Sequence, residues 1–383
     1  MNNLHISLNE LTNASRVLKQ TSSLARSGHF NHIYIAGLHL GDLKKEEVIS
    51  EKITLNRFSL STRKLSKNFF IQVIKYLEYC WRVLFFYRKK NIKVVNVHSL
   101  GLLPLGYALK KFYKARLVYD AHELETETNA SKGFRQKFSK WLEKKLIHKA
   151  DMTLVVSESI ADWYANEYKI ARPPVVFNAP NTRELKTNNH FREQLGIRDD
   201  QIILLYQGGL MPGRGVHLIL DAFKQRKNDK VVAVFMGYGE LETAITQAAA
   251  EHNTVFFFPA VAAQVVLEYT ASADMGIHLI QNTCLNHDYC MPNKLFEYAM
   301  AGLPVLVSNM KDMSELVTRY AMGAVISDFS AAGINQAVDN FLEQDLTDMK
   351  VNAYQAAYEN AWEVQEQKML AAYTEMFLQK GLN

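Results

Sequence analysis

The segment at positions 291–304, M-P-N-K-L-F-E-Y-A-M-A-G-L-P, contains the residues best suited to chemistry. Lys294 and Glu297 stand three residues apart, which places both side chains on one face of a helix. Pro292 is typical of the first turn of that helix and Gly302 of its end. Because the backbone N–H groups of a helix N-terminus favour an anion, a lysine beside them indicates a phosphate site. A carboxylate one turn later is suited to accept hydrogen bonds from a ribose diol.

A second candidate group follows a predicted strand at 202–206. Gly208 and Gly209 permit close approach of the backbone to a phosphate, although a pair of glycines is also typical of a plain turn. Arg214 lies in the setting Gly-Arg-Gly, which gives it no evident structural duty. A guanidinium there is suited to hold a diphosphate with two parallel hydrogen bonds and to neutralise a leaving group.

Two histidines follow strands in the first half of the chain. His122 comes directly after the predicted strand 117–121, and His98 ends the predicted strand 94–98. Ligands of open α/β sheets bind at the carboxyl ends of the strands, so both are candidate site residues. For each of them the alternative is a histidine that caps a helix or packs in the core.

No metal site is predicted. The three cysteines, Cys80, Cys284 and Cys290, fit neither a metal-ligand set nor a disulfide framework. No Asp-x-Asp pair stands at the end of a predicted strand, and no group of histidines and cysteines has metal-ligand spacing. We therefore expect positive side chains and helix N-termini to take the role that Mg²⁺ has in other enzymes.

The elements that position these residues alternate between short apolar strands and amphipathic helices along the whole chain. This alternation is typical of α/β folds with parallel sheets. A polar segment from Asn178 to Asn189 separates two sets of strands, which predicts two doubly wound domains. The predicted strands cover residues 5–8, 32–38, 94–98, 117–121, 152–156 and 174–177, and then 202–206, 231–236, 254–258, 275–279, 305–307 and 324–326.

The net charge divides at nearly the same place. Residues 1–180 contain 29 Lys and Arg against 15 Asp and Glu, a net charge of +14, whereas the rest contains 15 against 24, a net charge of −9. A basic part without a helix-turn-helix pattern could still face nucleic acid, and an anionic membrane surface fits as well. Of the two partners we predict the membrane surface and no nucleic acid. For the basic helix predicted at 69–90 we favour a helix that covers the sheet with a solvated outer side. For the one at 132–149, that reading and a membrane-bound helix both remain open.

The chain shows no targeting or membrane-spanning segment. Its first residues lack the basic and apolar regions of a signal peptide. The apolar stretch 69–87 carries Lys75, Glu78 and Arg82, too much charge for a bilayer span. We therefore expect a cytoplasmic protein, peripheral at the inner face of the membrane.

The late segment also resembles a known pattern. Residues 292–308, P-N-K-L-F-E-Y-A-M-A-G-L-P-V-L-V-S, resemble the donor-site segment of the retaining glycosyltransferases of family four, which have the GT-B fold. Further pieces resemble other parts of this family in the same order, at 206–215, 234–239, 258–274 and 362–366. The resemblance covers most of the chain.

The resemblance implies a fold of two Rossmann-like doubly wound domains that face each other across a cleft. Residues 1–185 would form the acceptor-binding domain, residues 186–365 the nucleotide-sugar-binding domain, and residues 366–383 a C-terminal helix that packs back on the first domain. It also implies a hexosyl- or N-acetylhexosaminyl-transferase that retains configuration by front-face attack, without a metal or other cofactor. We favour a UDP-sugar as donor over a GDP-sugar. The acceptor would be a carbohydrate or a lipid-linked glycan of surface-polysaccharide synthesis.

The resemblance also suggests roles for single residues. His122 would hold a hydroxyl of the donor sugar, and Arg214 and Lys294 would act on the diphosphate; these three are the predicted catalytic residues. The nucleotide would be bound by Gly208, Gly209, Gly237, the backbone near Val261, and Glu297. The donor sugar would be bound by the loop Asp288, Tyr289, Cys290 and Met291, and His98 would line the acceptor side. The chain departs from the family pattern twice, because Tyr289 replaces a usual glutamate and Gly209 an arginine found in many relatives.

Two other functions remain open. A sugar-nucleotide epimerase of similar architecture would act on the sugar nucleotide without an acceptor. A nucleotide-binding scaffold without activity is suggested by the two departures, and it would bind nucleotide without transfer or hydrolysis.

Overall fold

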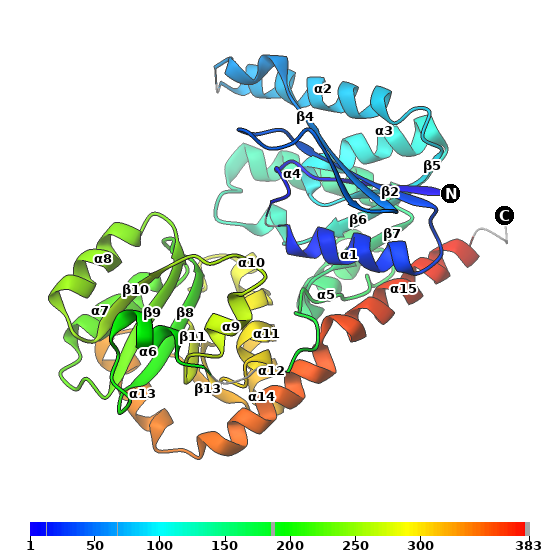
Figure 1. Cartoon of the computed structure of the whole chain (residues 1–383). Coiled ribbons are helices and arrows are strands. Elements are labelled where there is room, and N and C mark those ends of the chain that lie inside the picture. The colour runs from blue at the N-terminus through cyan, green and yellow to red at the C-terminus, as the bar shows by residue number, and fades with distance from the viewer. Residues whose placement is uncertain (13, 67, 185–187, 380–383) are drawn as a thin grey trace. The chain divides into compact units, whose positions relative to one another are not determined.

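The computed structural model describes residues 1–12, 14–66, 68–184 and 188–379. The chain forms two compact units, Met1–Val176 together with the stretch from Glu366 onward, and Phe177–Gln365. Each unit is built on one largely parallel sheet with helices on its faces, which confirms the predicted two-domain α/β fold (Figure 1). The predicted domain boundary between residues 185 and 186 lies outside the described residues, as do the last four residues of the predicted segment 366–383.

The sheet of the first unit has the strand order β3-β4-β2-β1-β5-β6-β7. Its strands are β1 (Asn2–Ile6), β2 (His32–Leu38), β3 (Glu46–Ser50), β4 (Ile53–Phe58), β5 (Ile92–Val97), β6 (Arg116–Ala121) and β7 (Met152–Val155). Only β3 runs antiparallel, as the edge strand of a hairpin with β4. The sequence-based prediction missed this hairpin, and the strand predicted at 174–177 is reduced to an isolated bridge between Val155 and Val175.

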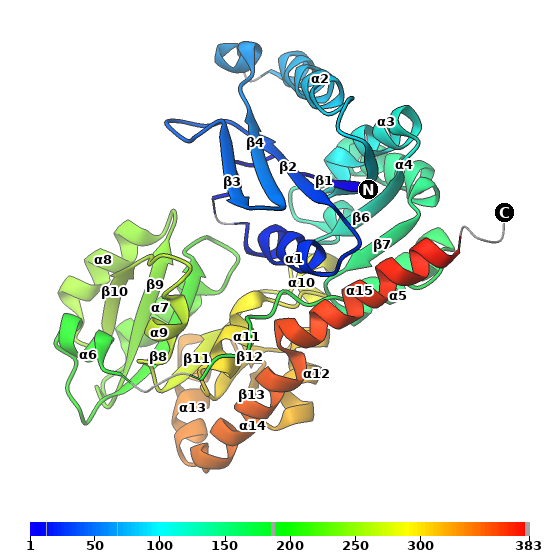
Figure 2. The same cartoon turned by 45° about the vertical axis from the view of Figure 1, so that its right-hand side comes forward.

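Helices cover both faces of this sheet. They are α1 (Ser15–Arg26), α2 (Phe69–Phe86), α3 (Leu103–Tyr113), α4 (Gly133–Leu146) and α5 (Glu158–Tyr168), with short 3-10 helices η1 (Ser61–Lys64), η2 (Leu100–Leu102), η3 (Glu125–Glu127) and η4 (Ile147–Lys149). The right-handed crossovers from β4 to β5, β5 to β6 and β6 to β7 all step across the sheet in one direction, so α2, α3 and α4 share a face. The crossover through α1 steps the other way, and α1 lies on the opposite face (Figure 2).

The last helix, α15 (Trp362–Leu378), continues from the second unit into the first. In the first unit its Phe377 carbonyl accepts a hydrogen bond from Arg116, and its Tyr373 hydroxyl donates to Asn96 of β5. Phe30 packs edge-on against both Tyr373 and Phe377. These contacts dock α15 on the same face of the sheet as α1.

The second unit has a six-stranded, all-parallel sheet of order β10-β9-β8-β11-β12-β13. The strands are β8 (Ile202–Gly209), β9 (Val231–Tyr238), β10 (Val255–Pro259), β11 (Met275–His278), β12 (Val305–Ser308) and β13 (Gly323–Ile326). The helices are α6 (His190–Leu195), α7 (Val216–Gln225), α8 (Glu242–Glu251), α9 (Val266–Thr270), α10 (Leu285–Asp288), α11 (Asn293–Met300), α12 (Lys311–Tyr320), α13 (Ala331–Leu342) and α14 (Leu346–Asn360). Apolar side chains of β8, β9 and β11 pack with α7, α8 and α13 in one buried cluster, as the continuous apolar runs of these strands require.

The outer side of α2, expected to be solvated, is exposed and carries large apolar residues. Of its residues only Tyr79 and Val83 are buried. Phe69, Phe70 and Trp81 are 76%, 78% and 62% exposed. Within the described residues, no helix is long and apolar enough to cross a membrane.

Candidate functional site

Lys294 and Glu297 lie in the first turns of α11, as the spacing predicted. The helix is fixed to the sheet by the next residue, Tyr298, whose hydroxyl accepts the N–H of Gln207 at 3.0 Å and donates to the carbonyl of Leu205 at 3.0 Å. Gly276 of β11 makes room for the Tyr298 ring, since a Cβ there would lie 2.6 Å from it. The start of α11 is thereby held at the carboxyl ends of β8 and β11.

The Lys294 ammonium is buried without a hydrogen-bond partner among the described residues. Its Nζ lies 4.0 Å from the centre of the Tyr206 ring, a cation–π contact. A Cβ added at Gly208, whose φ is +114°, would come within 3.3 Å of the same Nζ. Burial, with a smaller contribution from Arg214, lowers the pKa of Lys294 to about 7, and Glu297 opposes this shift. A buried cation without a bound anion is costly, so the arrangement is suited to receive an anionic ligand.

Glu297 is oriented by a residue that the sequence analysis did not identify. Its carboxylate accepts a hydrogen bond of 2.6 Å from Nε2 of Gln207 at the end of β8. The side-chain oxygen of Gln207 in turn accepts from the hydroxyl of Thr270 at 2.7 Å. Gln207 is 2% exposed, and a buried amide at the end of an apolar strand was a signal that could have been read.

The glycines near the carboxyl ends of β8 and β9 are required for different structural reasons. Gly208 adopts a positive φ beside Lys294, in accordance with a close ligand approach. At Gly237 a Cβ would lie 1.9 Å from the Gly208 carbonyl oxygen, so strand packing alone explains this glycine. Gly215 has φ +77° and backs directly onto the Leu279 carbonyl, which fixes the end of the loop that carries the exposed Arg214. Gly209 shows no such close neighbour on its backbone.

His278 is a further polar residue of this edge that the sequence analysis missed. It ends β11, is 1% exposed, and its Nδ1 has no hydrogen-bond partner among the described residues. Burial lowers its pKa well below the usual range, and the nearby charges of Lys294 and Arg214 lower it further. A neutral imidazole beside two cations therefore adds an uncharged hydrogen-bonding group.

The loop predicted to bind the donor sugar begins at Asp288, the last residue of α10. Asp288 accepts a long hydrogen bond of 3.4 Å from Asn282, and the ammonium of Lys311 stands over the Tyr289 ring at 5.5 Å. Burial raises the pKa of the Cys290 thiol to about 12, so this thiol is not a nucleophile at neutral pH. Met291 and, in the loop after β10, Val261 are half-buried.

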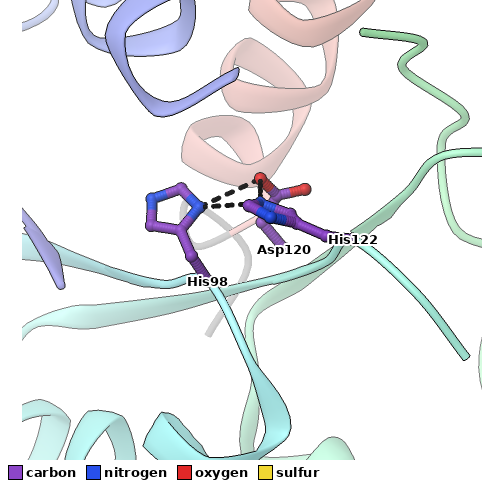
Figure 3. A group of neighbouring side chains, drawn as sticks. All are labelled: His98, Asp120 and His122. Atoms are coloured by element: carbon purple, nitrogen blue, oxygen red, sulfur yellow. Dashed lines mark hydrogen bonds and ion pairs between the residues drawn. The ribbon is translucent and has the colours of Figure 1, made fainter. Parts of the chain in front are cut away.

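In the first unit, His98 and His122 meet around Asp120 at the carboxyl ends of β5 and β6 (Figure 3). Oδ2 of Asp120 lies 3.1 Å from His98 Nδ1 and 2.9 Å from His122 Nε2. The two histidine nitrogens are 3.2 Å apart. His122 retains 33% exposure of its side chain, whereas the side chains of His98 and Asp120 are 1% exposed.

Asp120 is held ionised by groups of α1. Arg16 donates to both carboxylate oxygens, at 2.7 Å from Nη2 to Oδ1 and 3.0 Å from Nε to Oδ2, and Gln20 donates to Oδ2 at 2.8 Å. Burial alone would raise the pKa of Asp120, but Arg16 and the two histidines hold it well below the usual range. Neither Asp120 nor Arg16 was identified from the sequence, although Asp120 lies on the strand only two residues before His122.

A chain of buried hydrogen bonds continues from His98 into the sheet. His5 Nδ1 lies 2.9 Å from His98 Nε2, and Asn3 Nδ2 lies 3.2 Å from His5 Nε2. Asn3 Oδ1 accepts from Asn96, whose own oxygen accepts from the Tyr373 hydroxyl of α15. Burial lowers the pKa of both His5 and His98, so both rings are neutral.

The chain of hydrogen bonds assigns the ring tautomers. With Nδ1–H of His98 directed to the carboxylate, His98 Nε2 accepts from His5 and His5 Nε2 accepts from Asn3. Every donor then points towards Asp120. In the neutral tautomer of His122 that donates Nε2–H to the carboxylate, Nδ1 is an acceptor for a ligand.

Each of the two units matches a known protein-family model. Residues 14–182 match the family model described as Glycosyltransferase Family 4, and residues 187–361 match the model described as Glycosyl transferases group 1. Among curated proteins, the lipopolysaccharide 1,2-N-acetylglucosaminetransferase of Salmonella typhimurium is 32% identical over 114 residues. That match spans 26% of this chain and 30% of the relative.

Solved structures resemble the whole chain at low sequence identity. Sucrose-phosphate synthase from Thermosynechococcus elongatus has a TM-score of 0.82 at 14% identity, with 99% of this chain and 100% of that chain covered. HepE from Anabaena, solved in complex with UDP, has a TM-score of 0.75 at 16% identity, with 98% and 100% covered. The chain therefore matches one glycosyltransferase family model on each unit, and it has the GT-B-like fold that these solved structures share.

Proposed function

We propose that this protein transfers a sugar from a nucleotide-diphosphate donor, with a UDP-sugar favoured over a GDP-sugar, to an acceptor hydroxyl. The observation that carries the proposal is the buried Lys294 ammonium, which has no hydrogen-bond partner among the described residues and lies beside Gly208. A diphosphate supplies the missing anion, and the exposed Arg214 supplies a second cation. Glu297, oriented by Gln207, would accept the ribose hydroxyls.

The reaction breaks the bond between the anomeric carbon and the phosphate oxygen and forms a bond from that carbon to the acceptor oxygen. Negative charge develops on the departing diphosphate, where Lys294 and Arg214 stabilise it more in the transition state than in the ground state. For front-face attack with retention, the leaving phosphate oxygen takes the proton of the acceptor hydroxyl. His122 then holds a sugar hydroxyl through Nδ1.

A second mechanism is favoured by one observation, the pairing of His122 with the ionised Asp120. A histidine oriented by a carboxylate can serve as general base, taking the acceptor proton during attack from the opposite face. That reaction inverts the anomeric configuration. Proton NMR of the first-formed product distinguishes the two mechanisms by the coupling constant of the anomeric proton.

The donor and acceptor classes draw on the related proteins. HepE was solved with UDP and with UDP-glucose, and the Salmonella relative is named for N-acetylglucosamine transfer to lipopolysaccharide. We infer a UDP-hexose or UDP-N-acetylhexosamine donor and a lipid-linked glycan acceptor for this chain. The basic first unit would contact the anionic membrane that holds such an acceptor.

Incubation with single nucleotide sugars tests the proposed function. Thermal stabilisation by one of them, followed by slow release of UDP that an acceptor accelerates, is the expected result. Conversion of the donor to an isomer without an acceptor would instead establish the epimerase. Binding without hydrolysis or transfer, for all glycan acceptors tried, would establish the inactive scaffold.

Catalysis is expected to need no metal ion. His98, Asp120 and His122 present ligand atoms within 4.8 Å of one another and could hold a cation. However, both Asp120 oxygens already accept hydrogen bonds from the Arg16 guanidinium, whose charge opposes a metal. Preincubation with EDTA should therefore leave the transfer rate within about twofold. A large loss that Mg²⁺ or Mn²⁺ restores would contradict the metal-free mechanism.

Replacement of Glu297 by alanine is expected to weaken UDP binding. Loss of charge-assisted hydrogen bonds to the ribose corresponds to about 1.5–3 kcal/mol, roughly a 10- to 100-fold rise in Kd by calorimetry. Gln207→Leu should weaken binding less, because it removes only the orienting bond. Glu242→Ala, at an exposed position on α8, is the matched control and should bind as the wild type does. If Glu297→Ala binds both UDP and GDP with unchanged affinity, the ribose assignment is wrong.

A further inference from the structure

The helix α2 exposes its apolar side instead of burying it. Phe69, Phe70, Val73, Ile74, Leu77, Trp81 and Phe85 are all exposed, between 39% and 78%. At 100° per residue these positions share one face of the helix. The two buried residues, Tyr79 and Val83, lie on the opposite face, where the Tyr79 hydroxyl donates to the carbonyls of Ser7 and Ala36. The helix is therefore fixed to the sheet through Tyr79 and Val83 and presents an apolar stripe outward.

The helix α4 repeats this arrangement on the same face of the sheet. Phe134, Phe138 and Trp141 are 85%, 50% and 55% exposed and stack on one another along the helix. The opposite side of α4 is buried through Glu143, which accepts hydrogen bonds from three tyrosine hydroxyls of β6 and α5. An aromatic stripe without a covering partner therefore occurs on two separate helices of one unit.

Exposed cations flank the stripe of α4 and follow the end of α2, and neither helix carries an exposed carboxylate. On α4 the exposed charged residues are Arg135, Lys137, Lys144 and Lys145. Helical spacing places Lys137 and Arg135 on either side of the aromatic stripe. On α2 the one acidic residue, Glu78, is half-buried and paired with Arg82. Exposed Arg88, Lys89 and Lys90 follow the end of α2. This charge pattern is complementary to an anionic surface.

A pocket beside α2 is lined by both aromatic and charged side chains. It has a volume of about 450 Å³ and lies between the β3–β4 hairpin and the second half of α2. Trp81, Phe85 and Phe86 form its apolar wall. Its charged lining is Lys45, Glu46, Arg57 and Arg82, and both arginines are paired with carboxylates, Arg57 with Glu47 and Arg82 with Glu78. The apolar stripe of α2 therefore continues into this pocket through Trp81 and Phe85.

We propose that α2 and α4 form a docking surface for an anionic phospholipid bilayer, with their aromatic stripes at the level of the headgroups. Both helices begin at the carboxyl edge of the sheet, where His98 and His122 also lie. The 18 residues of α2 give an apolar stripe about 27 Å long, suited to lie in the plane of the interface. The inference adds to the proposed function the surface that would bring the enzyme to a lipid-linked acceptor.

Vesicle flotation of the full chain tests the surface. We expect binding to phosphatidylcholine vesicles containing about a third phosphatidylglycerol, and at least tenfold weaker binding to phosphatidylcholine alone or at high salt. Each of two triple variants, Phe69→Ser with Phe70→Ser and Leu77→Ser on α2, and Phe134→Ser with Phe138→Ser and Trp141→Ser on α4, should bind on the order of tenfold more weakly. Val351→Ser with Tyr358→Ser, at exposed positions of α14, is the matched control and should bind as the wild type does.

Three outcomes would overturn the proposal. These are absence of binding to the anionic vesicles, equal binding to both vesicle types, and a wild-type dimer in solution that the α2 variant converts to a monomer. The last outcome would show that a second copy covers the stripe. The variants' hydrolysis of the donor without vesicles, expected at the wild-type rate, separates this result from a failure of the proposed reaction.

Discussion

Lys294→Met is expected to lower sugar transfer on the order of 10²- to 10³-fold while leaving the free protein as stable as the wild type or more so. The transfer rate falls because the ammonium that stabilises the leaving diphosphate is lost. Stability is kept because the removed charge is buried, has no hydrogen-bond partner among the described residues, and is replaced by an apolar chain of similar length. Calorimetry with UDP should show weaker binding, and a thermal melt should show an unchanged or higher Tm without ligand.

The pH dependence of the unfolding free energy independently tests the lowered pKa of Lys294. Its pKa is about 7 in the folded protein against a usual value of 10.5. Between these pH values the unfolded chain binds more protons than the folded one, so the contribution of Lys294 to stability rises with pH across this window. The difference in unfolding free energy between wild type and Lys294→Met should therefore change by on the order of 3 kcal/mol from pH 7 to 10. Saturating UDP should abolish much of this change, because a bound diphosphate favours the charged lysine.

A matched control keeps the interpretation specific. Lys311→Met removes another lysine near this edge, one whose ammonium stands over the Tyr289 ring. Because the Lys311 side chain is exposed, its removal should leave the Tm without ligand close to that of the wild type. If Lys294→Met transfers sugar at the wild-type rate, the diphosphate assignment is wrong, whatever the melts show.

Part of the candidate site in the second unit could be predicted from the spacing of residues along the sequence. Lys294 and Glu297 could be paired from the sequence because three residues along a helix fix their relation. Gln207 and His278 could not be assigned in the same way, because each meets α11 only through the folding of separate strands; Gln207 and Glu297 are 90 positions apart. Long-range contacts of this kind leave no periodic signal in one sequence.

The structure of the first unit was predicted less completely from the sequence, for two physical reasons. The hairpin of β3 and β4 was missed because every residue of β3 is exposed, so no alternation of apolar and polar residues marks it. The sequence also does not tell which side of α2 is buried, because apolar residues occur on nearly all sides of this helix. The structure decides it through the inward hydrogen bonds of Tyr79.

Asp120→Asn is expected to have the second large effect, and its signature is the state of His122. An asparagine of the same size presents an N–H₂ group where Oδ2 now accepts from both histidines. His122 would then have to accept through Nε2 and carry its proton on Nδ1, the atom assigned to the ligand. We expect transfer to fall by on the order of 10²-fold, since the ligand-facing atom changes from acceptor to donor.

The same substitution should also reduce stability, because Arg16 keeps a buried charge and loses its carboxylate. Breaking a buried ion pair from one side costs about 3–5 kcal/mol, so the kinetics must be measured well below the Tm. Tyr373→Phe removes one hydroxyl at the far end of the same hydrogen-bonded chain and should cost about 1 kcal/mol, with transfer within about twofold. Loss of activity in both variants to a similar degree would attribute the effect to folding.

Nitrogen-15 NMR of histidine-labelled protein distinguishes a change of the His122 tautomer from a loss of folded structure in Asp120→Asn. In the wild type the His122 ring should show a protonated Nε2 and an unprotonated Nδ1, and in Asp120→Asn the reverse. His122→Ala, which leaves Arg16 and Asp120 paired, should lose transfer to a similar extent while its Tm changes little, because this side chain is one-third exposed. The NMR measurement needs neither sugar donor nor sugar acceptor. It therefore tests the role of Asp120 even if the enzyme uses another sugar substrate. A wild-type ring protonated on Nδ1 would show that His122 offers a donor to its ligand, and both the base and the acceptor roles assigned to that atom would then have to be abandoned.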